Sequence, residues 1–149
     1  MGPLYGLRHT GLSTRSFYVR SAIRPSTSEH DELLAVGSSS GSPVLFPTDE
    51  RHYRPSQHRQ EQDYETPTDM LPIYTTGTAL VRGHEAEVTG VAWTKDGELI
   101  SVGDDYKARV WREDRVKARE LRQKGEGEGQ RWGCGWADVE DAEWDEEDG

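Results

Sequence analysis

The sequence predicts an all-β fold in which two similar groups of short antiparallel strands are separated by a polar insertion. Three observations support this. Apolar residues gather in four short clusters, at 17–23, 33–46, 71–81 and 88–111. The clusters are rich in strand-forming side chains and are bounded by turn residues, and the chain repeats itself weakly. Because only 32% of the residues are hydrophobic and 31% are charged, we expect short ordered segments within a partly disordered chain.

The clearer copy of the repeat spans residues 80–111. Its strand-length runs and turns alternate in the order 88–93, 95–97, 99–103, 104–105 and 107–111. The Asp96-Gly97 pair is a strong hairpin signal because glycine tolerates a positive φ. We therefore expect three or four antiparallel strands here, within a unit that we assign to residues 77–112.

An earlier, eroded copy occupies residues 1–47. Three of its segments align with the later copy: Arg8–His9 with Gly83–His84, residues 17–23 with the first strand, and residues 33–38 with the second. Pro43–Phe46 then aligns with the last strand. His9 and His84 lie 75 residues apart, too far for a repeat of roughly 40 to 45 residues. Removing residues 48–76, a polar stretch of 29 residues, leaves 46, so we interpret that stretch as a disordered insertion.

Residues 113–149 are predicted to form a charged linker and an acidic tail. Residues 113–124 favour a short solvated helix, and the glycines of 125–129 end it because each costs about 1 kcal/mol relative to alanine. Residues 138–149 hold eight Asp or Glu and no Lys or Arg. We expect this tail, like residues 48–70, to lack regular structure.

Charge and cysteine content exclude several classes of function. Setting aside the eight acidic residues of the tail changes the net charge from −10 to −2, so the body is nearly neutral and has no basic nucleic-acid footprint. The single cysteine, Cys134, excludes an intramolecular disulfide and a cysteine-only metal site, which favours a reducing compartment. The sequence contains no apolar run of roughly 18 to 20 residues and no signal-peptide pattern, so we expect a soluble, unexported protein.

Four polar side chains of the clearer copy resemble the structural network of the WD-repeat family: His84, Ser101, Asp105 and Trp111. A buried imidazole needs partners for both nitrogens, and a carboxylate and a hydroxyl that relays to an indole N–H supply them. The resemblance implies a partial β-propeller of about two blades, a protein-interaction module without catalytic residues.

The alternative for His84 and Asp105 is a catalytic dyad. The structural interpretation is favoured, because both residues stand at the repeat's structural positions and no nucleophile motif such as G-x-S-x-G accompanies them. His30, His52 and His58 lie in polar loops without the spacing of metal sites, so we expect them to be solvated. We predict no metal and no cofactor.

The WD pattern is incomplete in both copies. Arg112 follows Trp111 where the family has aspartate. In the earlier copy, Val36 stands at the serine position, Ser40 at the aspartate position and Phe46–Pro47 at the Trp-Asp position. We therefore expect that copy to form its blade through apolar packing alone.

Residues 16–23, 34–39 and 82–93 also resemble the last two blades of the denticleless-type substrate receptors of cullin-4 ubiquitin ligases, as do the Trp111–Arg112 ending and residues 135–137. The resemblance implies a nuclear adaptor in replication control, the cell cycle and ubiquitin-dependent degradation. Its partners would be the damage-specific DNA-binding adaptor, cullin-4 and clamp-bound replication-licensing substrates. The alternative is a generic WD-repeat scaffold of another nuclear or cytoplasmic complex.

Two blades cannot close a ring, because propellers need roughly four to eight. We expect the core of the second blade to come from apolar side chains on its strands: Val88, Val91, Trp93, Ile100, Val110 and Trp111. Both outer flanks would then face water, so we expect the isolated chain to be marginally stable or to self-associate. A monomer that unfolds cooperatively at about 45 to 65 °C would contradict this expectation.

Overall fold

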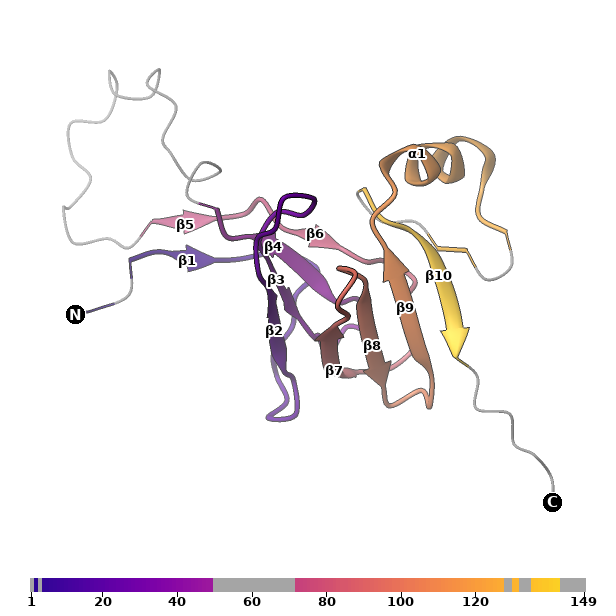
Figure 1. Cartoon of the computed structure of the whole chain (residues 1–149). Helices are drawn as coiled ribbons and strands as arrows, with labels where there is room; N and C mark the ends of the chain where they lie inside the picture. The colour runs from indigo at the N-terminus through magenta and orange to yellow at the C-terminus, as the bar shows by residue number, and fades with distance from the viewer. Residues whose placement is uncertain (1, 3, 50–71, 128–129, 132–134, 143–149) are drawn as a thin grey trace.

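The computed structural model describes residues 2, 4–49, 72–127, 130–131 and 135–142 (Figure 1). The strands of these residues are β1 (Gly6–Leu7), β2 (Ser21–Arg24), β3 (Leu33–Val36), β4 (Val44–Pro47), β5 (Ile73–Tyr74), β6 (Thr78–Ala79), β7 (Val88–Trp93), β8 (Leu99–Gly103), β9 (Ala108–Arg112) and β10 (Ala137–Ala142). The helix α1 covers Arg115–Lys124. It is too short and too polar to cross a membrane.

Two four-stranded antiparallel sheets form the body of the molecule, and they lie side by side in Figure 1. The first blade has the strand order β2-β3-β4-β6, and the second blade has the order β7-β8-β9-β10. A short parallel pair, β1 with β5, lies beside the first blade. The predicted all-β class and the partial propeller of about two blades are confirmed.

The strand register supports the alignment of the two copies. Leu34 lies opposite Phe46 in the first blade, just as Leu99 lies opposite Trp111 in the second. The first strand of the earlier copy was predicted too long, since β2 begins only at Ser21 and the segment before it forms a turn. Phe17 in that turn is fully exposed, because no neighbouring element covers it.

One strand connects the two units by crossing their boundary in the sequence. β6 belongs to residues 77–112, yet it pairs with β4 and so forms the outer strand of the first blade. The second blade therefore needs an outer strand from elsewhere.

The C-terminal segment supplies that strand, which corrects the prediction that residues 138–149 lack regular structure. β10 pairs antiparallel with β9, from Ala137 opposite Arg112 to Ala142 opposite Ala108. Without it, the outer edge of β9 would expose unpaired N–H and C=O groups. Trp136 and Val139 are buried, so apolar side chains anchor the acidic strand to the blade.

The predicted insertion of residues 48–76 is irregular over less of its length than expected. Ile73 and Tyr74 form β5, so the prediction is wrong at these two residues, which the parallel pairing with β1 orders. The predictions for residues 50–71 and 143–149 lie outside the described residues.

Helix α1 confirms the prediction for residues 113–124, but the helix is not solvated on all sides. The Asp114 side chain caps its N-terminus by accepting a hydrogen bond from the Lys117 N–H at 2.8 Å. Ala118 and Leu121 are buried together with Ala137 of β10, so the helix packs on the second blade.

The main core fills the space between the two blades. Its buried members are Ala35, Leu45, Leu80, Leu99, Trp111, Trp136 and Val139, and Leu33, Val91 and Trp93 pack against them. Ile100 and Val110 are only half-buried. They alternate with core residues along β8 and β9 and therefore belong to the other face of the sheet, so the prediction that placed them in the core is wrong.

Candidate functional site

The structure brings all four residues of the predicted network together inside the second blade. His84 lies in the loop before β7, Ser101 in β8, Asp105 in the turn after β8 and Trp111 in β9. His84 Nδ1 is 3.0 Å from Asp105 Oδ1, and its Nε2 is 2.8 Å from Ser101 Oγ. Trp111 Nε1 donates to the same Ser101 oxygen at 3.0 Å.

The donors and acceptors fix the direction of this chain of hydrogen bonds. An indole N–H can only donate, so Ser101 Oγ accepts from Trp111 and directs its own hydrogen at His84 Nε2. The Nδ1–H of a neutral imidazole then donates to Asp105. Gly103 makes room for this contact, because a Cβ there would lie 2.9 Å from His84 Nδ1.

The environment favours the neutral imidazole and the charged carboxylate. Burial lowers the pKa of His84, and the charges of Arg109 and Lys107 act in the same direction against the hydrogen bond from Asp105. Burial acts to raise the pKa of Asp105, but hydrogen bonds from His84 and from the Glu85 and Lys107 N–H groups outweigh it. The pKa of Asp105 therefore lies below its usual value.

We predict that acidification destabilises the chain through His84. The unfolded state gains a proton as the pH falls through about 6.5, whereas the folded state gains it only at lower pH. Stability should be greatest above pH 6.5 and decline below it, which urea denaturation at about pH 7.5 and about pH 5.5 would measure. A His84→Gln variant should lose much of this dependence, and an equal dependence in the variant would contradict the assignment.

The Ser101–His84–Asp105 order resembles the order of a hydrolase triad, which makes access to the serine decisive. Ser101 is fully buried, and its oxygen already accepts the Trp111 N–H. A nucleophile must reach its substrate. This geometry therefore supports a structural role over a catalytic dyad. The described residues also contain no group of three or more His, Cys, Asp or Glu placed to hold a metal ion.

The first blade replaces the network with a serine cluster, which corrects the expectation of apolar packing alone. Ser38 Oγ accepts the Ser13 N–H at 2.9 Å and lies 2.8 Å from Ser40 Oγ. Ser40 in turn donates to the Gly11 carbonyl at 2.7 Å. These bonds attach the segment before β2 to the turn after β3.

Arg24 connects the two blades and was not identified from the sequence. Its side chain is 3% exposed and donates to the Asp31 and Gly97 carbonyl oxygens, both at 3.1 Å, and to Glu113 Oε2 at 3.2 Å. Because Gly97 and Glu113 follow it by 73 and 89 residues, no local pattern could reveal these contacts.

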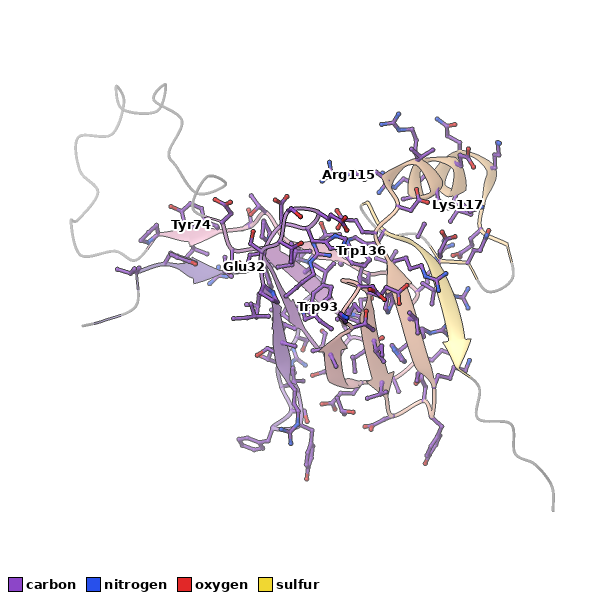
Figure 2. All side chains as sticks on the ribbon, viewed as in Figure 1. Glu32, Tyr74, Trp93, Arg115, Lys117 and Trp136 are labelled. Atoms are coloured by element: carbon purple, nitrogen blue, oxygen red, sulfur yellow. The ribbon has the colours of Figure 1, made fainter. Side chains whose placement is uncertain are left out.

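Two tryptophans enclose the Arg24 guanidinium. It lies 5.0 Å from the ring centroid of Trp93 and 6.0 Å from that of Trp136. The labelled tryptophans lie close together in Figure 2, with centroids 6.0 Å apart. Trp93 Nε1 also donates to the Ala22 carbonyl of the first blade at 3.0 Å. Cation–π attraction and hydrogen bonds therefore both hold the blades together.

We predict that Arg24→Met lowers the free energy of unfolding by about 2 to 3 kcal/mol, because buried carbonyl oxygens lose their donors. Arg24→Lys should restore only part of this loss, since an ammonium lacks the planar, forked guanidinium. Urea denaturation followed by tryptophan fluorescence measures both variants. Equal stability of Arg24→Met and the wild type would show that these contacts do not hold the blades together.

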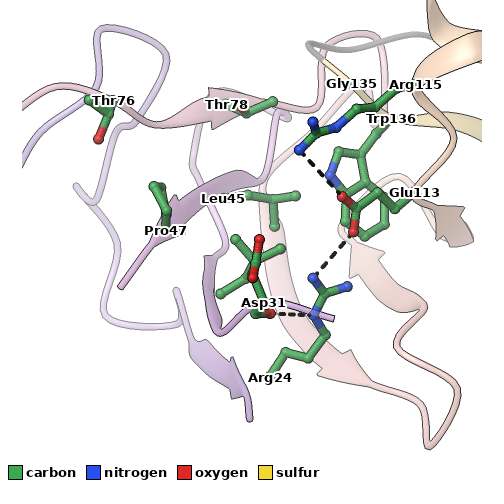
Figure 3. A pocket seen from close by; sticks show the side chains of 11 residues that line it. Arg24, Asp31, Leu45, Pro47, Thr76, Thr78, Glu113, Arg115, Gly135 and Trp136 are labelled. Carbon is green, nitrogen blue, oxygen red and sulfur yellow. Dashed lines mark hydrogen bonds and ion pairs between the residues drawn. The ribbon is translucent and has the colours of Figure 1, made fainter. Parts of the chain in front are cut away.

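A cavity of about 180 Å³ lies beside these contacts, between the outer strands of the first blade and the segment that leads into α1 (Figure 3). Leu33, Leu45 and Trp136 form its apolar lining. Glu113 contributes a carboxylate that accepts from Arg24 and lies 4.0 Å from Arg115 Nη2. The arginine charges are thus compensated within the protein.

His30 differs from its predicted solvated state. A Cβ on Gly97 would lie 2.8 Å from the His30 ring, so the imidazole packs on the turn between β7 and β8. It therefore belongs to the contact between the blades. His52 and His58 lie outside the described residues.

Comparison with known proteins identifies the repeat. Residues 75–112 match the family model described as WD domain, G-beta repeat. The chain is 29% identical over 121 residues to the Denticleless protein homolog of Danio rerio, covering 80% of this chain and 13% of that protein. It is 37% identical over 60 residues to the Cell division cycle protein cdt2 of Schizosaccharomyces pombe, covering 40% and 12%.

A third relative has a different name. The chain is 31% identical over 88 residues to the Probable cytosolic iron-sulfur protein assembly protein 1 of Kluyveromyces lactis, covering 58% of this chain and 22% of that protein. No solved structure matches the chain. The chain thus carries a WD-repeat protein-interaction module, and it spans less than a quarter of the length of each of these relatives.

Proposed function

We propose that the chain provides two adjacent blades of a substrate receptor in a cullin-4 ubiquitin ligase. It would act in the nucleus, in replication control and ubiquitin-dependent degradation. Its partners would be the damage-specific DNA-binding adaptor, cullin-4 and replication-licensing substrates bound to the sliding clamp. In this role it binds proteins and catalyses nothing itself.

The similarity to the denticleless homolog carries this proposal. It covers 80% of the chain and so extends well beyond the WD repeat at 75–112. A match confined to the repeat would indicate only the fold, because one fold serves many functions. The similarity to cdt2 adds support from a second organism.

The network of His84, Ser101, Asp105 and Trp111 would serve this function by fixing a loop. Asp105 accepts from the Glu85 N–H at 3.1 Å, so the network ties the loop before β7 to the turn after β8. We therefore assign these four residues a structural role in presenting the binding surface.

Adaptor docking through residues 111–114 is not part of the proposal. The docking signature of the wider receptor class, Trp-Asp-x-Arg, is replaced by Trp111-Arg112-Glu113-Asp114. Each of the last three has a local role here: Arg112 pairs with Glu98 at 2.6 Å, Glu113 accepts from Arg24, and Asp114 caps α1. The docking signature would have to lie in other blades.

Affinity purification of the tagged full chain from cells, followed by mass spectrometry, tests the proposal. We expect cullin-4 and its adaptor to co-purify. A His84→Ala variant is the matched control, because loss of the network should weaken the second blade and reduce recovery of these partners. Absence of both proteins from the wild-type preparation would reject the ligase function.

The second candidate is a WD-repeat scaffold of another nuclear or cytoplasmic complex. The 31% identity to the yeast iron–sulfur protein assembly protein favours it. The same purification distinguishes the two, since recovery of iron–sulfur assembly proteins without cullin-4 would support the scaffold. Fluorescence microscopy of the tagged chain would add the compartment, which is nuclear in the leading proposal.

A further inference from the structure

The second blade leaves one face of its sheet uncovered. Side chains that lie opposite one another across a sheet share a face, and successive residues alternate between faces. One face packs against the first blade through Leu99 and Trp111. The other, which we call the open face, consists of the paired rows Ala92–Ile100–Val110 and Gly90–Val102–Ala108.

The open face is apolar and accessible. Val102 is 41% exposed, Ala92 is exposed, and Ile100, Ala108 and Val110 are half-buried. Beside these rows lies an ion pair, with Arg112 Nε 2.6 Å from Glu98 Oε1. A face that is apolar in the middle and carries both charges at its border can pack against a copy of itself without leaving a net charge.

The far face of the first blade is largely occupied, which corrects the expectation of two open flanks. Phe46 is 1% exposed and Val44 is 0% exposed. A Cβ on Gly77 would lie 2.7 Å from the Phe46 ring, so the chain before β6 covers this face. Only Ile23, on the inner strand, remains strongly exposed there.

This asymmetry determines which assembly is possible. A head-to-tail contact would place the open face of one copy on the far face of the first blade of the next. That contact is blocked along the outer strands. An isologous contact uses the same patch on both copies and closes after two.

We propose that the chain forms a homodimer by packing the open faces of two copies against each other, sheet on sheet. The face measures on the order of 300 Å² per copy, from strand spacings of about 4.8 Å and rises of about 3.3 Å. This is below the roughly 800 Å² per partner of stable dimers, so the dimer is weak and depends on concentration.

Sedimentation velocity of the purified full chain over about 10 to 500 µM tests the dimer. We expect the sedimentation coefficient to rise towards a dimer limit. Val102→Asp should weaken association about tenfold or more, because it places like charges in the contact. Ala92→Asp should do the same, and both positions are exposed enough to accept the charge without unfolding, as circular dichroism would check.

Two matched variants locate the contact. Val116→Asp, on an α1 residue that is 70% exposed, should leave association unchanged. Ile23→Asp should also leave it unchanged. A wild-type chain that stays monomeric throughout the range overturns the proposal. Loss of association in Ile23→Asp but not in Val102→Asp also overturns it, because that pattern indicates a head-to-tail contact.

Discussion

Trp111→Ala should lower the free energy of unfolding by about 3 to 5 kcal/mol, the range for removing a large aromatic side chain from a core. Trp111 is fully buried, belongs to the core between the blades and donates to Ser101. The substitution therefore leaves a cavity and also removes the donor at one end of the network. Urea denaturation monitored by circular dichroism measures the loss.

Trp111→Phe separates these two effects. It keeps most of the buried apolar surface and removes only the N–H, so we expect a smaller loss of about 1 to 2 kcal/mol. Ser101→Ala should cost a similar amount, because it leaves the same N–H without an acceptor. If Trp111→Phe were as damaging as Trp111→Ala, the hydrogen bond rather than the packing would dominate at this position.

Truncation after Gly135 should destabilise the second blade by about 3 kcal/mol or more. It removes the buried side chains Trp136, Ala137 and Val139, and each large apolar side chain contributes about 1.5 to 3 kcal/mol on burial. It also exposes the edge of β9 and one side of the Arg24 guanidinium. Differential scanning calorimetry should show a lower midpoint and a smaller unfolding enthalpy.

Truncation after Ala142 is the matched control. It removes acidic residues of the tail and keeps all of β10, so we expect little change in the midpoint. Equal destabilisation by both truncations would mean that residues 143–149, rather than β10, stabilise the blade.

The sequence alone predicted the features that depend on neighbouring residues. Alternating apolar runs and the Asp96–Gly97 turn predicted β7 and β8, and the glycines after residue 124 marked the end of α1. The four residues of the network could be selected because a family pattern fixes their spacing. Each of these signals lies within one turn, one strand or one repeat.

Only the tertiary structure decided how the units join. β6 pairs with the preceding blade, β10 completes the second blade from a segment dominated by charge, and Arg24 contacts residues 73 and 89 positions later in the chain. Composition described the tail correctly as acidic, but backbone pairing with β9 and a few buried apolar side chains outweighed that composition. Pairing between distant strands depends on which edges are left unsatisfied, and a local pattern in the sequence carries no record of those edges.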